Sequence, residues 1–185
     1  MSFAGLETDR LRLRPFLPAD RDAYRALNAD PLVRRYLGGV LTAAEADAER
    51  EEIAAFFTRR GLGMIPVVRK ADGAFLGTCG LSYTPWYPDL EIGWRLLPAF
   101  WGQGYASEAA RAWRDHAFGA LGVARLISVA DAPNVASHRV MARLGLRFDH
   151  EALLEDGGAT FAAHIYALDA AGWSAAGNLP GRAGV

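Results

Sequence analysis

The chain has 185 residues, of which 51% are hydrophobic and 22% charged, a balance that excludes a disordered protein and fits one globular domain. A formal net charge of −1 offers no extended basic surface to nucleic acid, and no apolar run approaches the roughly 18 residues of a membrane span. The only cysteine, Cys79, has no intrachain partner, and the four histidines lack the spacing of metal ligands. We therefore expect a cytoplasmic protein that binds no metal, nucleic acid or membrane.

The N-terminal segment predicts a strand followed by short helical pieces. Residues 8–15 alternate, with Leu11 and Leu13 on one face and three arginines on the other, which is the period of a half-buried strand. A short helix is expected after Pro18, and a second turn or helix over residues 30–39.

A longer helix and a hairpin come next. The pattern Thr42-x-x-Glu45 is a capping box, and the helix that it begins is predicted to end at Gly61 after two arginines. Apolar and β-branched residues over 64–69 and 74–83 flank a turn that contains glycine, which predicts an antiparallel hairpin.

Residues 90–109 predict a strand, a tight loop and a helix. Gly102 and Gly104 allow the backbone to turn its N–H groups toward one point, and a helix beginning near Tyr105 adds the positive end of its dipole. This geometry suits a phosphate group. A P-loop would require Gly-Lys-Ser/Thr, whereas Tyr105 and Ala106 follow Gly104, and the three-glycine dinucleotide fingerprint is not met either.

Beyond this loop the pattern alternates between helix and strand. Residues 125–130 have the length and β-branched content of a buried strand. Asn134 is a good N-cap for a following helix that stops at Gly145.

The C-terminal part predicts a last hairpin and a flexible end. Strands over 146–154 and 161–168 flank a turn rich in glycine. Because no linker or repeat interrupts the chain, we expect residues 1–169 to form a single domain and the Ala- and Gly-rich residues 170–185 to be a flexible tail.

The phrase Pro98-x-x-Trp101-Gly-Gln-Gly-Tyr-Ala106 resembles the acyl-coenzyme A loop of the GCN5-related N-acetyltransferase (GNAT) superfamily. Trp101 replaces the usual Gln or Arg, which is similar to the branch named for the ribosomal-protein N-terminal acetyltransferases RimJ and RimL. The strand Glu-Ile-Gly-Trp-Arg before the loop and the pattern Asn134-x-x-Ser137 after it strengthen this resemblance. It implies an α/β (α+β) fold, with a mixed, mostly antiparallel sheet of about seven strands, splayed between the fourth and fifth and flanked by about four helices.

The resemblance also implies a reaction, which is transfer of an acetyl group from acetyl-CoA to a primary amine by direct attack in a ternary complex. The acceptor could be a protein N-terminus or a small molecule, and a homodimer could form through sheet edges. The residues assigned to acetyl-CoA are Leu96, Leu97, Trp101, Gly102, Gln103, Gly104, Tyr105, Ala106, Ser107 and Asn134. A second hypothesis is a coenzyme A-binding sensor or interaction module that has lost turnover.

Two residues are candidates for catalysis. Glu91 lies in the predicted fourth strand, a few residues before a backbone oxyanion donor expected near Leu96 or Leu97, and could act as general base. Asp149 and Glu151 are weaker candidates for that role. Many members of the superfamily protonate the leaving thiolate with a tyrosine from the helix after the fifth strand, but this helix contains none, so the resemblance assigns that assistance to Ser137.

Three aromatic residues are candidates for acceptor binding. Tyr36 lies in a region that covers the acceptor site in the superfamily, although an aromatic residue at the end of an amphipathic helix more often belongs to the core. Trp86 and Tyr87 lie in a loop that contains two prolines, where they either stiffen the loop or form a wall of the acceptor pocket.

Overall fold

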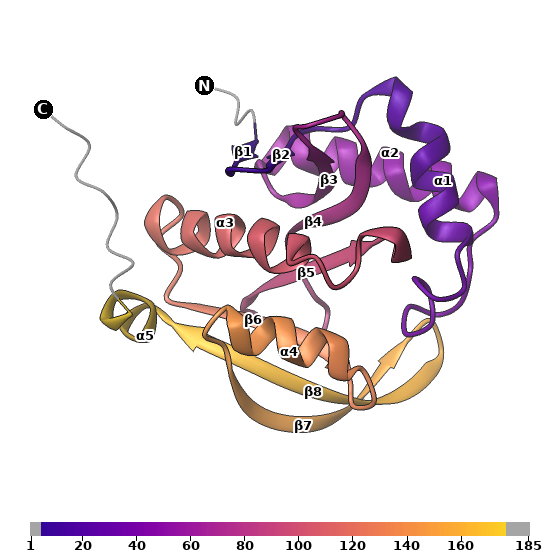
Figure 1. The fold of residues 1–185 in the computed structure, drawn as a ribbon. Coiled ribbons are helices and arrows are strands. Elements are labelled where there is room, and N and C mark those ends of the chain that lie inside the picture. Colours follow the sequence, from indigo (N-terminus) through magenta and orange to yellow (C-terminus); the bar gives the residue numbers. More distant parts are fainter. Residues whose placement is uncertain (1–4, 177–185) are drawn as a thin grey trace, which may run out of the picture.

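The computed structural model describes residues 5–176, which form one mixed sheet with helices on both faces (Figure 1). The strands are β1 (Leu6–Glu7), β2 (Leu11–Leu13), β3 (Gly63–Arg69), β4 (Phe75–Tyr83), β5 (Leu90–Leu96), β6 (Arg125–Asp131), β7 (Arg147–Asp156) and β8 (Ala159–Asp169). The helices are α1 (Arg21–Ala29), α2 (Ala43–Arg60), α3 (Tyr105–Gly119), α4 (Val135–Arg143) and α5 (Ala170–Ala175). Within this part of the chain, no helix is both long and apolar enough to cross a membrane.

The sheet is antiparallel except at its centre. Its strand order is β1-β2-β3-β4-β5-β6-β8-β7, and β5 and β6 are the parallel neighbours. They pair at only two positions, Leu90 with Leu126 and Glu91 with Ile127, whereas β4 and β5 pair along their whole length. The two parallel strands therefore part beyond Glu91, and the predicted splay between the fourth and fifth strands of the superfamily sheet is confirmed here between β5 and β6.

The two ends of the fold differ in detail from the prediction. Eight strands form instead of about seven, because a turn closed by Thr8 and Leu11, with an N–H···O distance of 2.9 Å, pairs Leu6 with Leu13 and adds β1. The expectation of a flexible tail is wrong for its first residues, since α5 forms there and Trp173 stacks on Phe118 at 5.4 Å. The remaining tail residues, 177–185, lie outside the described part.

Helices α3 and α4 cover one face of the sheet, and α1 and α2 cover the other (Figure 1). The larger core lies beneath α3, where alanines allow the helix to approach the strands closely and Trp113 is fully buried. The Trp113 indole N–H donates to the Cys79 carbonyl at 3.1 Å. Burial also raises the pKa of the Cys79 thiol, as expected of a packing residue and not of a nucleophile.

Helix α2 begins and ends as the sequence predicts. Thr42 Oγ1 accepts from the Glu45 N–H at 3.3 Å, while the Glu45 carboxylate accepts from the Thr42 N–H at 2.7 Å. Gly61 ends the helix in the left-handed conformation, with φ of 68°. Helix α2 also forms one wall of a pocket described below. Its start is fixed by the hydrogen bonds of Thr42 and Glu45, neither of which lines that pocket.

We predict that Thr42→Ala lowers the free energy of unfolding by about 1 kcal/mol, because it removes the acceptor for a helix N–H. The measurement is the urea midpoint of unfolding. Thr58→Ala on the same helix is the matched control, since the Thr58 hydroxyl only donates to the Ala54 carbonyl within the helix. Equal loss of stability in the two variants would contradict the importance of the cap.

Candidate active site

Strand β5 presents different side chains to the two faces of the sheet. Ile92 and Leu96 point into the core beneath α3. By the strict alternation of a strand, Glu91, Gly93 and Arg95 point to the opposite face, toward α1 and α2. Glu91 therefore reaches one side of the opening between β5 and β6 at the level where the two strands begin to part.

The carboxyl group of Glu91 connects the two parting strands. Its Oε1 accepts a hydrogen bond from the Val129 N–H of β6 at 3.2 Å. Burial raises the pKa of Glu91 from its ordinary value of 4.5 to about 7, and the Val129 contact opposes that shift. A carboxylate that titrates near neutrality can take up a proton from a substrate and release it again.

The backbone of β5 offers hydrogen-bonding groups to the opening, but not all of the predicted ones. The Leu97 N–H donates to the Leu76 carbonyl of β4 at 2.9 Å. The prediction that this N–H group could stabilise the oxyanion is therefore wrong. Because N–H groups alternate in direction along an antiparallel ladder, those of Trp94 and Leu96 point toward β6, where the strands no longer pair. Of the two predicted donors, only Leu96 remains.

Trp101 closes the turn that follows β5 and supplies no free N–H group. Its backbone N–H donates to the Pro98 carbonyl at 3.1 Å, and its indole N–H donates to the Leu96 carbonyl at 2.6 Å. Both N–H groups of Trp101 are therefore used within the turn. The residue is 48% exposed, and its assignment to acetyl-CoA stays a prediction.

The glycine loop has the conformation that phosphate binding requires. Gly102 and Gly104 have φ of 72° and 81°, which a side chain would strain. The first hydrogen bond of α3 runs from the Glu108 N–H to the Gly104 carbonyl at 3.0 Å. Within residues 5–176, no hydrogen bond uses the backbone N–H groups of residues 102–107, which include Gln103, Tyr105 and Ala106. These groups lie at the positive end of a helix of 15 residues.

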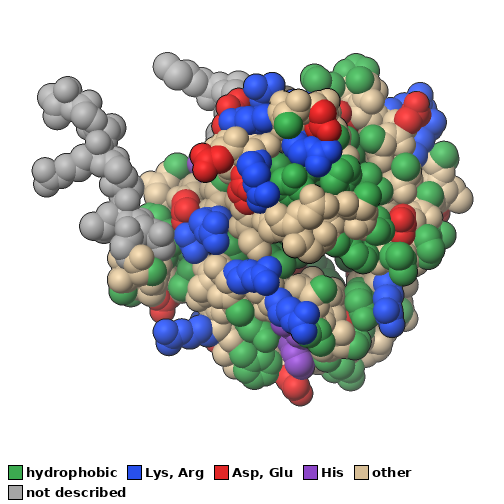
Figure 2. All heavy atoms as spheres, viewed as in Figure 1, with side chains coloured by type: hydrophobic (Ala, Val, Ile, Leu, Met, Phe, Trp, Pro, Cys, Tyr) green, Lys and Arg blue, Asp and Glu red, His purple; other side chains and the backbone are tan. Residues whose placement is uncertain are grey.

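Ser107 provides a second sign that this loop binds a ligand. Its side chain is buried, and its Oγ is without a hydrogen-bond partner among the described residues. A surface pocket of about 550 Å³ includes Ser107 and Gly104, and its lining holds three arginines and three carboxylates: Arg10, Arg111, Arg143, Asp9, Glu108 and Asp115. Figure 2 shows basic side chains over α3 and α4, with acidic ones among them. The unsatisfied hydroxyl and the free N–H groups, and not a net positive charge, are what fit a phosphate-containing group.

Arg10, one of the arginines predicted to lie on a solvated strand face, holds the glycine loop in place. Its guanidinium pairs with Glu108 at 2.6 Å, donates to the Gln103 carbonyl at 3.2 Å and lies 4.4 Å from the centre of the Tyr105 ring. These partners are nearly 100 residues away in the sequence, so no local pattern distinguishes Arg10 from its neighbours. The loop conformation therefore depends on β2 as well as on its glycines.

The start of α4 brings Asn134 and Ser137 to the α3 face of the sheet. Asn134 Oδ1 accepts from the Ser137 N–H at 3.2 Å and caps the helix. The amide oxygen thus accepts one hydrogen bond within the helix, and its second lone pair and the amide nitrogen are left to reach a cofactor. Contacts from Asn134 or from the Ser137 hydroxyl to a cofactor stay predictions.

On the opposite face, Tyr36 connects two segments that border the opening. Its hydroxyl lies 3.5 Å from the Pro133 carbonyl, just before α4, while its own segment consists of successive turns between α1 and α2. Tyr36 thus links the α1–α2 connection with the β6–α4 connection. A substrate entering between these connections would meet its ring, as the acceptor prediction requires.

Trp86 and Tyr87 are fixed by the β7–β8 hairpin. The Trp86 indole N–H donates to the Glu155 carbonyl at 2.9 Å, and its ring packs edge-on against Phe161 at 5.8 Å. The Tyr87 hydroxyl lies 2.9 Å from His150 Nε2. Both side chains thus hold the loop before β5 against the β7–β8 hairpin, as a stiffening role requires, and a contact with an acceptor stays a prediction.

Asp149 and Glu151 are engaged in other contacts, which weakens them as alternatives to Glu91. Asp149 lies 2.8 Å from His150 Nδ1 and 2.9 Å from Arg125, and the hydrogen bond with His150 is the main reason that its pKa is lowered. Glu151 lies 3.0 Å from His164 Nε2. A carboxylate with a lowered pKa is a weak base, so Asp149 is less suited than Glu91 to accept a proton.

A buried polar network, which the sequence did not reveal, supports the acceptor side. The Arg95 guanidinium donates to the Tyr24 hydroxyl at 2.8 Å and to Asn28 at 3.0 Å, and pairs with Glu49 at 3.2 Å. These partners come from α1 and α2. The network therefore joins β5, two residues from Gly93, to both helices on this face. The sequence signal is a second charged residue, besides Glu91, in a strand that is mostly apolar.

Residues 10–147 match the family described as Acetyltransferase (GNAT) domain. The chain is 29% identical over 174 residues to the uncharacterized N-acetyltransferase YoaA of Bacillus subtilis, covering 90% of this chain and 97% of that protein. It is 35% identical over 152 residues to the FsC-acetyl coenzyme A-N(2)-transacetylase of Aspergillus fumigatus, covering 76% of this chain and 64% of that protein.

Solved structures give the same picture of the fold. An acetyltransferase from Agrobacterium tumefaciens superposes with a TM-score of 0.77 at 32% identity, covering 91% of this chain and 95% of that one. RimL, a ribosomal L7/L12 alpha-N-protein acetyltransferase solved in complex with coenzyme A, superposes with a TM-score of 0.74 at 19% identity, covering 88% and 95%. At 19% identity the likeness to RimL extends to the fold alone.

The raised pKa of Glu91 predicts a measurable effect of pH on stability. Because the folded state holds the Glu91 proton more tightly than the unfolded chain, the protonated group stabilises the fold below pH 4.5, and that contribution is lost as the pH rises through about 7. Relative to Glu91→Gln, the wild type should lose as much as about 3 kcal/mol of unfolding free energy over this interval.

The measurement is urea unfolding of both proteins at a series of pH values. Other groups titrate equally in the two proteins, so the difference isolates Glu91. A difference that stays constant from pH 4.5 to 7.5 would show that Glu91 has an ordinary pKa.

Proposed function

The chain belongs to the acetyltransferase (GNAT) family, and we propose that it transfers an acetyl group from acetyl-CoA to a primary amine by direct attack in a ternary complex. It is an acetyl-CoA-dependent acyltransferase, as its N-acetyltransferase relatives indicate. One observation carries the proposal. A carboxyl group with a pKa of about 7 lies where β5 and β6 part, on the strand that leads directly into the glycine loop.

The residues that would hold acetyl-CoA follow from the donors already described. The N–H groups of residues 102–107 and the Ser107 hydroxyl would bind its pyrophosphate. The N–H groups of Trp94 and Leu96 would pair with the pantetheine amides along the open side of β5. The acetyl end would then lie in the opening between β5 and β6, near Glu91.

Glu91 would accept the proton that the acceptor ammonium must lose. Transfer from an α-amine of pKa about 8 to a carboxylate of pKa about 7 is uphill by roughly 1.4 kcal/mol. Transfer from a lysine of pKa about 10.4 to the same carboxylate costs roughly 4.6 kcal/mol. This difference favours an amine of lowered pKa, such as a protein N-terminus or a small-molecule α-amine, over an unperturbed lysine.

Backbone and helix groups would complete the reaction. The Leu96 N–H would donate to the carbonyl oxygen as it gains charge, in an opening from which the sheet and helices exclude much of the water. The Ser137 hydroxyl, in the first turn of α4, would donate to the departing sulfur. Tyr36, Trp86 and Tyr87 would border the acceptor, with their orientation set by contacts to the β6–α4 connection and the β7–β8 hairpin.

The central test is release of free coenzyme A thiol from acetyl-CoA on addition of a panel of α-amines, lysine side-chain amines and small aliphatic amines. Transfer is expected for at least one class of primary amine, with α-amines preferred. A protein that binds acetyl-CoA saturably and releases no thiol above background with any amine would contradict the proposal.

We predict that Glu91→Gln lowers kcat by about 100-fold or more, since a positioned general base contributes that much. In the wild type, kcat/KM should rise with pH and level off above about 7, because the carboxylate form is the base. The variant should lose this dependence while binding acetyl-CoA as tightly as the wild type. An unchanged pH profile in the variant would exclude Glu91 as the base.

Ser107→Ala is predicted to weaken acetyl-CoA binding by about 10-fold to 150-fold, because a hydrogen bond to a charged phosphate contributes roughly 1.5–3 kcal/mol. The same change should leave the free energy of unfolding unchanged or slightly raised, since the hydroxyl has no partner to lose among residues 5–176. Isothermal titration with acetyl-CoA and urea unfolding measure the two effects. Ser174→Ala in α5, away from the loop, is the control. A Ser107→Ala variant that loses stability but binds acetyl-CoA as tightly as the wild type would contradict a role of Ser107 in binding.

A further inference from the structure

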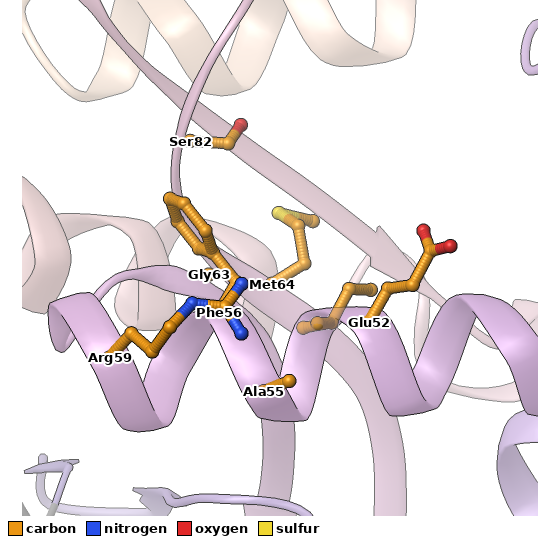
Figure 3. Close-up of a pocket in the computed structure, with 8 residues that line it drawn as sticks. Glu52, Ala55, Phe56, Arg59, Gly63, Met64 and Ser82 are labelled. Carbon is orange, nitrogen blue, oxygen red and sulfur yellow. The ribbon is translucent and has the colours of Figure 1, made fainter.

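A second pocket, of about 480 Å³, lies between α2 and the strands on the acceptor face of the sheet. It is lined by Glu52, Ile53, Ala55, Phe56, Arg59, Gly63, Met64 and Ser82. Figure 3 shows the Phe56 ring and the Met64 side chain between α2 and the strands, with Ser82 beyond them. Most of the exposed lining is apolar, and the charged groups of Glu52 and Arg59 come from α2 on either side of Phe56.

This pocket adjoins Glu91. Ser82 lies directly across from Glu91 in the β4–β5 ladder, so both side chains point to the same face of the sheet. Met64, Gly80 and Gly93 form the next row on that face. No side chain therefore stands between Met64 and β5 in this row.

Gly93 gives the Met64 side chain room to pack on β5. A Cβ added to Gly93 would lie 3.3 Å from the Met64 sulfur, which is tighter than an ordinary contact, so Met64 covers Gly93. The pocket borders Glu91 through Ser82, which belongs to its lining, and the apolar surface of Met64 and Phe56 lies beyond Ser82. A molecule with its nitrogen at Glu91 could place an adjoining group there.

We propose that the acceptor is a primary amine with an apolar chain or ring next to the amine, and that this group occupies the pocket beside Met64 and Phe56. The inference rests on the proposed function and specifies the acceptor of that same site. Methionine and phenylalanine form a surface that adapts to apolar groups of different shape. A second ammonium group beside Met64, Phe56 and Ile53 would lose its hydration, and the one carboxylate in the lining, Glu52, has the cationic Arg59 in the same lining.

The size of the effect follows from the area that the substituent would bury. Each methylene group removed from water in such a pocket changes kcat/KM by about tenfold or more. An acceptor with a leucine or phenylalanine side chain should therefore exceed the corresponding glycine compound by at least about tenfold. A lysine side chain should gain much less, because its ammonium group must stay in water.

The experiment compares kcat/KM for the α-amines of glycinamide, leucinamide, phenylalaninamide and lysinamide with saturating acetyl-CoA. The expected order places leucinamide and phenylalaninamide at least about tenfold above glycinamide, with lysinamide between. Met64→Gln, which keeps the length of the side chain but makes it polar, should reduce the leucinamide-to-glycinamide ratio several-fold. Leu121→Gln, at an exposed apolar position in the α3–β6 turn, should leave that ratio unchanged.

The outcomes separate this inference from the proposed function. Equal kcat/KM for all four amides, or a ratio unaffected by Met64→Gln, would overturn the pocket assignment while acetyl transfer itself stands. If neither the four amides nor the wider amine panel causes release of thiol, the proposed function is overturned, and this inference with it. If Met64→Gln fails to fold, Phe56→Leu tests the same surface, with the phenylalaninamide-to-leucinamide ratio as its readout.

Discussion

The short parallel pairing of β5 and β6 is the constraint on which the site depends. The two strands share a ladder only at Leu90 and Glu91, and beyond that point their facing backbone groups have no strand partner. Unpaired N–H and C=O groups in the middle of a sheet are costly unless a ligand or water satisfies them. The hydrogen bond from the Val129 N–H to Glu91 marks the end of the pairing and holds the carboxyl group at the start of the opening.

The two faces of the sheet support the two halves of the site by different means. Beneath α3 the support is apolar, with Trp113 and the alanines of the helix packed on the strands. Toward α1 and α2 it is a polar network centred on Arg95, which is largely buried and whose two terminal nitrogens contact Tyr24, Asn28 and Glu49. Removing one member of such a network leaves the others unsatisfied, so the acceptor side is held rigidly.

The likeness to solved acetyltransferases concerns the scaffold more than the acceptor. A shared sheet and glycine loop position the acyl donor, whereas the residues that differ among members of one fold decide what is acylated. In this chain the proposed acceptor side is formed by α2, the first residues of β3 and the loop before β5. The apolar surface of Met64 and Phe56 beside Glu91 is therefore the feature most relevant to acceptor choice.

The sequence by itself determined those features that local interactions control. The capping box at Thr42, the glycine loop and the alternating strands each depend on residues within one turn or one strand, so their patterns are readable without tertiary contacts. The family resemblance predicted that the sheet opens between its fourth and fifth strands and that Glu91 lies beside this opening. Both agree with the observed pairing of β5 and β6.

Only the tertiary structure decided which polar groups are free. The Leu97 and Trp101 N–H groups are engaged, whereas among residues 5–176 those of residues 102–107 and the Ser107 hydroxyl have no partner. The raised pKa of Glu91 and the role of Arg10 likewise come from burial and from partners far along the chain. Hydrogen-bond partners and desolvation are properties of groups brought together by folding, and no local pattern encodes them.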